Sequence, residues 1–518
     1  MVEALIKTRK FNKEKFEQIL NKCILVIEFV ISIILLYLIY QIVIYKNYQN
    51  IWHLKYILCS LFLGTIVVGC IIWNCKKSKF EKIIISFLIP IGMAYVFFIA
   101  PGYVPDEQAH IWKALEISEG KLMTGITEDG ESKESIPHFF ENHIIPYIKT
   151  YGHFNNVSKE KTDYNDLFEV QNPAQAYPAV LYIASSIAFF IGKILGLNGI
   201  FAIYLAKIFN FIIFLILGYF SMKCIPFGKW IVAIILFLPM SLQQAVSVSA
   251  DSFLNAVSIL FICYTMYLCK NTDEINIKDK IIYIVMGIII AISKVVYISI
   301  IGISLLIIGN KKIKNKEKGI FLSTLIILSV ISGIIWFFII QSYPVAESNL
   351  TYNETYNINL KEQVMNIIKN PMIFVTVLNN TFKGGFYVEG IVGSLMGWLN
   401  IEISRLVTLG FIILLALAPF LDENKVTLNI KQKIWNIIIF LGTYTLIILA
   451  AYVSWTTVNS DKVMGVQGRY FLPIIILPLI CLCDKERYIK FKNIKYILPT
   501  VCVGLNIIAI VDIAKFFL

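Results

Sequence analysis

Runs of apolar residues long enough to cross a lipid bilayer recur along the whole chain and constrain its fold more than any other feature. Hydrophobic residues make up 58% of the 518 residues and charged residues 15%, and the mean hydropathy is +0.73. Because a helix needs roughly 20 apolar residues to cross, we expect an all-α polytopic membrane protein with about 11 to 14 transmembrane helices. The runs that support this expectation are 22–45, 55–74, 82–100, 199–221, 228–245, 252–269, 319–341, 402–420, 433–453, 470–484 and 495–516.

Two other apolar stretches are ambiguous. Residues 281–309 look like a helical hairpin that bends near Ser293 and Lys294. Residues 177–197 either cross the membrane or lie as a re-entrant or interfacial helix. This choice decides on which side of the membrane Asp251 lies.

The distribution of basic residues predicts which loops share a side of the membrane. The formal net charge is +12, and the lysines and arginines gather in short clusters between the apolar runs. Cytoplasmic loops carry an excess of Lys and Arg, so we expect these clusters and the N-terminus in the cytoplasm and see no sign of nucleic-acid binding. The polar segments 101–176, 342–401 and 454–469 are then extracytoplasmic, provided that 177–197 does not cross.

This pattern divides the chain into four parts. Residues 1–80 hold a basic segment and two additional spans, and 81–341 form a membrane module that includes the long first outer loop. A second outer segment, 342–401, precedes the C-terminal spans of 402–518. The outer loop 101–176 shows no obvious regular structure, and loops of that length are usually functional.

The stretch from Tyr103 to His110, Tyr-Val-Pro-Asp-Glu-Gln-Ala-His, is the first candidate site. Pro105 suits the first position of a helix, which places Asp106 and Glu107 in its first turn. His110 follows four and three residues later, so the three side chains can share one face. Two carboxylates and an imidazole at a membrane edge are candidate catalytic groups, although Pro-Asp-Glu also begins many ordinary helices.

Ionisable residues inside apolar runs are further candidates, because they usually face a cavity or pair with one another. Asp251, Lys207 and Lys294 are the examples here. They are therefore candidates for catalysis or for binding an anionic substrate.

An arginine at the outer mouth of a span is unusual in a chain whose basic residues otherwise stay inside. Arg469 lies in the sequence Gln467-Gly468-Arg469-Tyr470. Its planar guanidinium suits a phosphate, or else it anchors the chain to a lipid head group. Trp398, in a segment rich in glycines and aromatic residues, belongs either to a substrate-stacking surface or to an interfacial aromatic belt.

Together these motifs resemble a known family. Over roughly residues 80–510 the chain resembles the bacterial membrane-protein family called domain of unknown function 2142, which is itself similar to the GT-C glycosyltransferases. The matching motifs, in order, are Pro105-Asp106-Glu107 to His110, Tyr177-Pro178, Leu238-Pro239-Met240 to Asp251, Gly393 to Trp398, and Gln467 to Pro473. The resemblance implies a GT-C-like enzyme of the bacterial plasma membrane that takes sugars from polyprenyl-phosphate carriers on the outer face.

The resemblance also implies roles for individual residues. Asp106 or Glu107 would be the catalytic base, and Asp251 would assist it. Two features depart from the GT-C pattern: the spans 22–45 and 55–74 precede the expected first span, and a lysine, Lys207, stands where many members carry arginine. Lysine grips a phosphate as a point charge only.

The mechanism that we expect is an inverting sugar transfer to an envelope glycan or glycolipid. Arg469, with Lys207 or Lys294, would offset charge on the leaving phosphate, while His110 orients the base or binds a sugar hydroxyl. A divalent cation, Mg²⁺ or Mn²⁺, that bridges Asp106 and Asp251 stays an open alternative. The substrate-binding residues that we expect are His110, Lys207, Lys294, Trp398, Gln467, Arg469 and Tyr470.

Two other classes of protein fit the same residues. A transporter or flippase of a lipid-linked sugar or another anionic envelope precursor would use the embedded charges to bind its cargo. A non-catalytic scaffold for polymer assembly would leave the clustered acids without a role. The absence of a clear internal repeat and the acids at the start of the long loop favour the enzyme.

Overall fold

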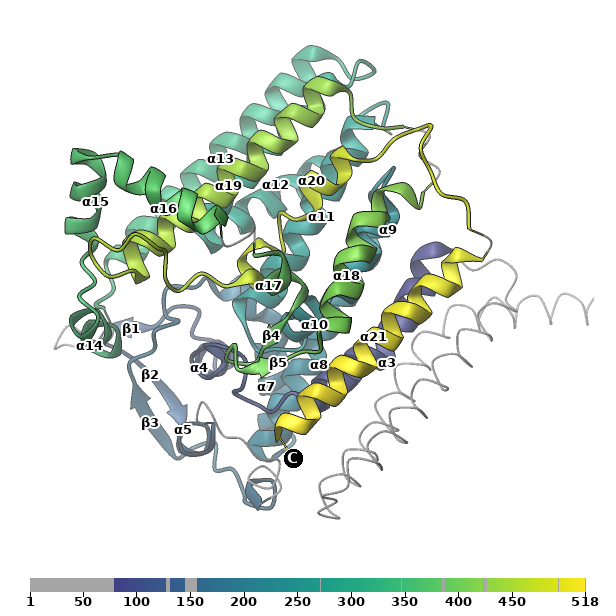
Figure 1. Cartoon of the computed structure of the whole chain (residues 1–518). Helices are drawn as coiled ribbons and strands as arrows, with labels where there is room; N and C mark the ends of the chain where they lie inside the picture. Colours follow the sequence, from purple (N-terminus) through teal and green to yellow (C-terminus); the bar gives the residue numbers. More distant parts are fainter. Residues whose placement is uncertain are drawn as a thin grey trace, which may run out of the picture.

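Helices dominate the computed structural model, which describes residues 79–126, 131–144, 156–270, 272–345, 347–383, 387–422, 424, 426–491 and 493–517. In this part of the chain six helices are long and apolar enough to cross a membrane (Figure 1). They are α3 (Phe80–Phe98), α8 (Gly199–Cys224), α11 (Ala250–Lys270), α13 (Asn315–Gln341), α19 (Ile430–Trp455) and α21 (Ile494–Phe517). The all-α membrane fold is thus confirmed, whereas the expected spans 22–45 and 55–74 lie outside the described residues.

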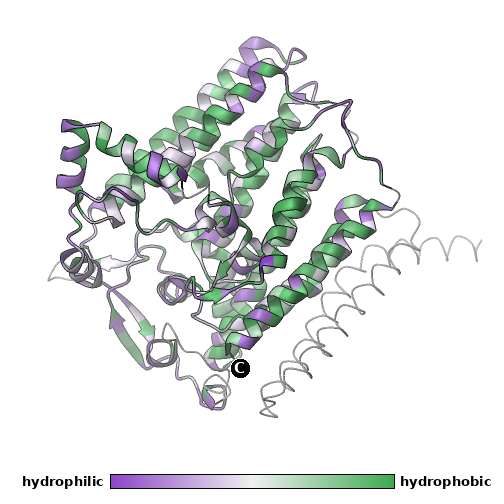
Figure 2. Cartoon of the chain, viewed as in Figure 1, coloured by the Kyte–Doolittle hydropathy of each residue, from purple (hydrophilic) through white to green (hydrophobic). Residues whose placement is uncertain are grey.

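The helices differ in how deeply they are buried. In α3 and α11, 89% of the most apolar stretch is buried inside the protein, but in α13 only 11% is buried. The outward side of α13 carries large apolar residues such as Ile334 and Phe338. An exposed apolar face suits a helix in contact with lipid, and Figure 2 shows the hydrophobic residues along these helices.

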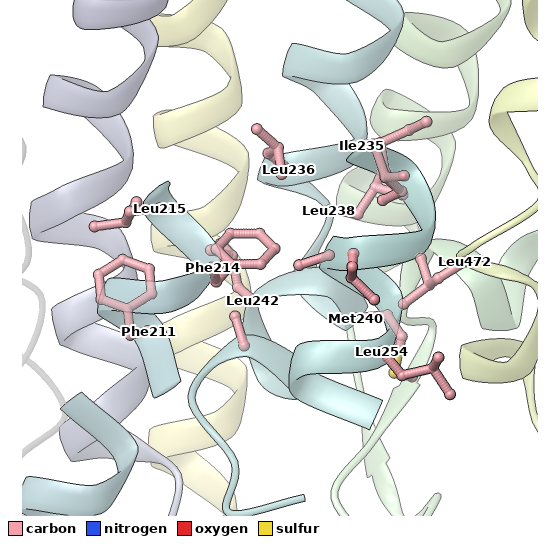
Figure 3. Close-up of a cluster of buried hydrophobic side chains, with 14 of the residues drawn as sticks. Phe211, Phe214, Leu215, Ile235, Leu236, Leu238, Met240, Leu242, Leu254 and Leu472 are labelled. Atoms are coloured by element: carbon pink, nitrogen blue, oxygen red, sulfur yellow. The ribbon is translucent and has the colours of Figure 1, made fainter. Parts of the chain in front are cut away.

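The run 228–245, expected as a single span, is two helices. α9 (Lys229–Phe237) ends before the extended residue Leu238, and α10 (Pro239–Ala245) begins with proline. The break follows from proline, which lacks an N–H and disfavours helical geometry in the residue before it. Figure 3 shows the buried side chains packed around this break, from Phe211 and Phe214 on α8 to Leu254 on α11. They fix the turn that leads into α11.

Two later runs are also divided into shorter elements. Residues 402–420 form α18 (Arg405–Leu417) and the 3₁₀ helix η3 (Ala418–Phe420). Residues 470–484 contribute to the 3₁₀ turn η4 (Gly468–Phe471) and to α20 (Ile476–Cys481). The irregular backbone at η4 brings Arg469 into the protein interior.

The expected hairpin over 281–309 is confirmed. α12 (Ile277–Ser293) and the 3₁₀ helix η2 (Val295–Gly309) are joined by Lys294, whose backbone is extended. Beyond η2, the Asn310 side chain donates hydrogen bonds to the carbonyls of Leu268 and Thr272, at the C-terminal end of α11. The hairpin therefore starts and ends on one side of the bundle and carries Lys294 to the other.

The first polar loop has more regular structure than its sequence predicts. It contains α4 (Glu107–Ser118), α5 (His138–His143) and an antiparallel sheet of β1 (Gly125–Ile126), β2 (Ser132–Pro137) and β3 (Leu167–Val170). In the register of β2 and β3, Ser135 lies opposite Glu169. The strands are short, and β2 pairs with β3 across a long stretch of sequence, so no local pattern indicated that pair, whereas β1 and β2 are neighbours in the chain.

Residues 177–197 do not run across the bundle. They form η1 (Ala179–Tyr182) and α7 (Ile183–Ile194), and a helix of 12 residues is only about 18 Å long. At one end, Tyr182 contacts His110 of the first polar loop, and at the other the Leu197 carbonyl accepts a hydrogen bond from Tyr164 of the same loop. Both ends therefore lie against one loop, as the topology requires.

The second polar segment gathers at the same end of the bundle as this loop (Figure 1). Backbone and side-chain hydrogen bonds tie the two segments together, for example from Tyr343 to the Thr124 carbonyl. The elements are α14 (Glu347–Thr355), α15 (Leu360–Lys369), α16 (Met372–Lys383), α17 (Val388–Val392) and the strand pair β4 (Leu395–Met396) and β5 (Ile401–Glu402).

Candidate functional site

Arg469 is the centre of a charged cluster built from four distant parts of the chain. Its side chain is 4% exposed, and its Nη2 lies 2.9 Å from Asp106 Oδ2. Its Nη1 donates to the Pro105 carbonyl at 3.1 Å, and its Nε lies 3.7 Å from Asp251 Oδ2. At that distance Nε makes no hydrogen bond to Asp251, and it has no other hydrogen-bond partner among the described residues. A buried guanidinium thus retains one N–H that can donate to a ligand.

Asp106 is the solvent-accessible member of the cluster. Its side chain is 56% exposed, in contrast to 8% for Asp251. Asp106 has a φ of 67° and precedes α4 as its N-cap, but its side chain does not cap the helix. The helix begins at Glu107, two residues later than Pro105 suggests, so the sequence-based placement of Asp106 in the first turn is wrong. The left-handed backbone turns the carboxylate toward Arg469 instead.

Asp251 and Lys294 form the second ion pair of the site. Asp251 lies in the first turn of α11, and Lys294 lies at the tip of the α12–η2 hairpin. The Lys294 ammonium is 4.9 Å from the ring centroid of Tyr470 and 5.9 Å from that of Tyr177, within the range of cation–π attraction. Tyr297 adds support, because its hydroxyl donates to the Tyr470 carbonyl at 2.8 Å.

His110 lies beside these charges but is buried. Its Nδ1 is 2.6 Å from the Tyr182 hydroxyl, and its ring packs edge-on to Tyr177 with 5.2 Å between centroids. Burial lowers the pKa of His110 to about 4, and the nearby carboxylates of Asp106 and Asp251 only partly oppose this. The imidazole is therefore neutral near pH 7 and can orient a neighbour or bind a hydroxyl.

A cavity of about 520 Å³ adjoins the cluster. Lys294 and Tyr470 belong both to the cluster and to the cavity wall, so charge lies at one part of a largely apolar space. Apolar and aromatic side chains from the hairpin, α13 and α19 form most of the wall, and Tyr177, from the segment before η1, adds to it; the first group includes Tyr297, Trp336, Ile447 and Trp455. Such a space can hold an apolar chain with an anionic head at the charged end.

Glu107 and Lys207 do not belong to this cluster, contrary to the prediction that Glu107 shares a face with Asp106 and His110. Glu107 is fully buried and accepts hydrogen bonds of 2.9 Å from the backbone N–H groups of Gly102 and Val248. Burial raises the pKa of Glu107, and the charge of Lys207 opposes this effect. Lys207, itself fully buried, donates to the Ile99 carbonyl at 2.6 Å. The pair ties the first polar loop to α8 and to the turn before α11.

Two other predicted binding residues lie at the edge of the site. Trp398 donates through its indole N–H to the Gly102 carbonyl at 3.3 Å, so it supports the turn before Asp106 and does not line the cavity. Gln467 immediately precedes η4, and its buried Oε1 has no hydrogen-bond partner among the described residues. Gln467 therefore has polar capacity left for a ligand.

A cation bridging Asp106 and Asp251 is the remaining prediction for the site. Among the described residues there is no group of three or more His, Cys, Asp or Glu side chains arranged to hold a metal ion. The guanidinium of Arg469 occupies the position between the two carboxylates. These residues therefore fit a shared arginine and not a shared metal ion.

Sequence reasoning missed several residues that shape the site. Tyr182 contacts His110, and Tyr297 contacts Tyr470. Neither tyrosine stands out in the sequence, because each is an aromatic residue within a hydrophobic run. Tyr297 lies in the first turn of η2, whereas Lys294 precedes that helix with an extended backbone. Helical spacing therefore gave no signal for their proximity.

Comparison with known proteins places these residues within one family match. A model of a family described as predicted membrane protein, DUF2142, matches residues 89–478, well over half of the chain. The match includes Asp106, Asp251, Lys294 and Arg469. No curated protein and no solved structure matches the chain.

Proposed function

The chain belongs to the DUF2142 family of predicted membrane proteins, and we propose that it is an inverting glycosyltransferase. In this proposal it moves a sugar from a polyprenyl-phosphate donor to a glycan or glycolipid of the cell envelope. The observation that carries the proposal is the exposed carboxylate of Asp106, held by the buried Arg469 next to a large apolar cavity. A base, a phosphate-binding cation and a space for a lipid chain are the parts that such a transfer needs.

The donor phosphate would lie at the charged end of the cavity. There it meets Lys294, which lines the cavity, and lies near the neighbouring Arg469, whose Nε–H has no hydrogen-bond partner among the described residues. The four charged side chains of the cluster, Asp106, Asp251, Lys294 and Arg469, balance one another, so an added phosphate competes with the carboxylates for the two cations. This competition frees the Asp106 carboxylate to accept a proton.

The transfer itself needs one base. The acceptor hydroxyl oxygen attacks the anomeric carbon of the sugar and gives its proton to Asp106. The bond between that carbon and the phosphate oxygen breaks, and the electron pair leaves with the phosphate, whose charge Lys294 and Arg469 offset. Because the attack comes from the face opposite the leaving group, the configuration inverts and no covalent sugar–enzyme bond forms.

The proposal places the site outside the cytoplasm, with the N-terminus inside. The three polar segments gather at the site end of the bundle, and basic segments of the described chain, such as 311–318 and 426–433, lie at the other end. A reporter enzyme fused after Asn271 should therefore give a cytoplasmic signal. An extracytoplasmic signal there would show the opposite orientation. The site would then face the cytoplasm, away from the lipid-linked donors of the outer face.

Mass spectrometry of lipid-linked sugars and envelope glycans tests the function directly. We expect cells that lack the protein, or carry Asp106→Asn, to accumulate a polyprenyl-phosphate sugar and to lose one sugar from a glycan. Asp461→Asn is a matched control, because Asp461 is also an exposed acid in an outer polar segment but lies away from the cluster. Full rescue of the glycan by Asp106→Asn would remove Asp106 as the base.

A transporter of an anionic lipid-linked precursor is the second candidate. The observation in its favour is the Lys294–Asp251 ion pair at the tip of a broken hairpin, an arrangement that transporters use to bind cargo. The same analysis separates the two. Loss of a transporter would leave the lipid-linked sugar intact but on the side of the membrane where it is made. A transporter would also tolerate Asp106→Asn if the Lys294–Asp251 pair remains.

A further inference from the structure

A second groove lies at the opposite end of the α12–α13 pair from the site. It has a volume of about 470 Å³ and opens between the N-terminal turns of α12 and the start of α13. Its first lining residue on α12, Ile277, is separated from Lys294 by the whole length of that helix, about 25 Å. The groove is therefore distinct from the cavity next to Arg469.

The two walls of the groove are helix faces of similar pattern. α12 contributes residues 277, 280, 281 and 284, and α13 contributes residues 316, 317, 320, 321 and 324. Spacings of three and four place these side chains on one face of each helix. The apolar members are open to the surroundings: Ile277, Ile281 and Ile320 are 55% to 67% exposed. Because α13 is a candidate membrane span, exposed isoleucines on it face lipid chains.

The rim of the groove is positively charged. Lys280, Lys314 and Lys316 line it, against a single acid, Glu317. Glu317 already pairs with Lys280 across the groove at 2.9 Å. Neither Lys314 nor Lys316 forms an ion pair with any other described residue. Two lysines thus remain uncompensated directly above an apolar slot.

We propose that this groove binds an anionic phospholipid, with the phosphate at Lys314 and Lys316 and the acyl chains along the isoleucines. An uncharged or zwitterionic lipid would leave the excess positive charge unmatched, and a soluble phosphate would leave the apolar walls exposed. Basic pockets between transmembrane helices are known to select such head groups. The proposal is independent of sugar transfer, since the groove shares no residue with the Arg469 site.

Native mass spectrometry of the full chain in detergent provides the test. The protein is titrated with phosphatidylglycerol and with phosphatidylcholine of the same acyl chains. We expect tighter binding of phosphatidylglycerol to the wild type, and a loss of about tenfold to thirtyfold in the double variant Lys314→Gln, Lys316→Gln. Lys485→Gln with Lys490→Gln is the matched control, because both are exposed lysines outside the groove, and it should bind as the wild type does.

A third variant tests the apolar part of the site. Ile281→Trp should fill the slot and weaken phosphatidylglycerol binding while both lysines remain. Added sn-glycerol 1-phosphate should not displace the lipid, since it has no acyl chains. Equal affinity for the two lipids in the wild type, undiminished binding in the double lysine variant, or displacement by the soluble phosphate would each overturn the proposal.

Discussion

Asp106 and Glu107 are neighbours in the chain, yet they belong to two different electrostatic environments. The Asp106 carboxylate is 56% exposed and faces Arg469, whereas Glu107 is fully buried and faces backbone N–H groups and Lys207. The left-handed backbone at Asp106 sends the two side chains in different directions. Whether an acid near a membrane edge is exposed or buried therefore depends on its backbone, and its residue type alone does not decide.

The largest effect on stability should come from the buried acid. Glu107→Ala removes the acceptor of the Gly102 and Val248 N–H groups and leaves Lys207 without its counter-charge. We expect the free energy of unfolding to fall by about 3 to 5 kcal/mol, because buried donors and charges without partners are costly. Reversible unfolding by SDS in mixed micelles measures this change.

Glu119→Ala is the matched control for that experiment. Glu119 follows the same helix but is 44% exposed and pairs with Lys193 at the surface. Its loss should cost less than about 1 kcal/mol. If the two variants have equal stability, Glu107 is not the structural acid that its contacts indicate.

Acid pH should destabilise the protein through His110. Its pKa is lowered from 6.5 in an open chain to about 4 in the folded protein, because burial disfavours the charged ring. The unfolded chain thus binds more protons between these values, so stability is complete above about pH 6.5 and falls by up to about 3 kcal/mol as the pH drops toward 4.

Comparison with His110→Phe isolates this contribution. Glu134 acts in the opposite direction, since burial and the nearby charge of Glu116 raise its pKa to about 7, so its contribution to stability falls as pH rises from 4.5 to 7. Because Glu134 contributes equally to the wild type and to His110→Phe, its contribution cancels when the stabilities of the two proteins are subtracted. A difference that does not change between pH 7 and pH 4.5 would contradict a buried, neutral His110.

A smaller change in stability is expected at the centre of the cluster. Arg469→Lys keeps the charge but cannot contact Asp106 and the Pro105 carbonyl with a planar fork. We expect a loss of about 1 to 2 kcal/mol in stability and a fall of about 10²-fold in sugar transfer. Turnover in membranes that contain the donor lipid measures the second effect, and unchanged turnover would show that the guanidinium geometry is unimportant.

The smallest change in stability belongs to the exposed acid. Asp106→Asn keeps the shape of the side chain, and the Asp106 carboxylate is 56% exposed, so solvent screens its pairing with the buried Arg469 to less than about 1 kcal/mol. The unfolding free energy should therefore stay within that range while the proposed sugar transfer is lost. A variant that is both inactive and strongly destabilised would make Asp106 a structural acid like Glu107.

Much of the fold follows from the sequence because the bilayer imposes simple rules on length and polarity. The runs 82–100, 199–221 and 252–269 correspond to single helices, and the hairpin tip at Lys294 was visible as a charge inside an apolar stretch. The division of 228–245 was not predicted, although Pro239 gave a local signal for it. The small sheet depends on the pairing of β2 with β3, which are too far apart in sequence for a local pattern to indicate it.

The sequence indicated the candidate residues more readily than it indicated which of them come together in the site. Asp106, Asp251, Lys294 and Arg469 were each conspicuous as charges in unusual places, but their pairing requires four segments from distant parts of the chain. Helix spacing assigned Glu107 to the same face as Asp106, and the positive φ of Asp106 broke that spacing. A positive φ angle at a residue other than glycine cannot be inferred from the residue type alone.

The 3₁₀ geometry of η2 has a mechanical consequence. At about 2.0 Å per residue, its 15 residues reach about 30 Å, whereas an α-helix of the same residues would reach only about 22 Å. The hairpin arm is thus longer than an α-helix of the same residues would be, and Lys294 lies at its tip. Rewinding η2 into an α-helix would move the Lys294 ammonium away from Asp251 by several ångströms and open the charged end of the cavity. Spin labels at the two ends of η2 would register this change as a shorter distance between them.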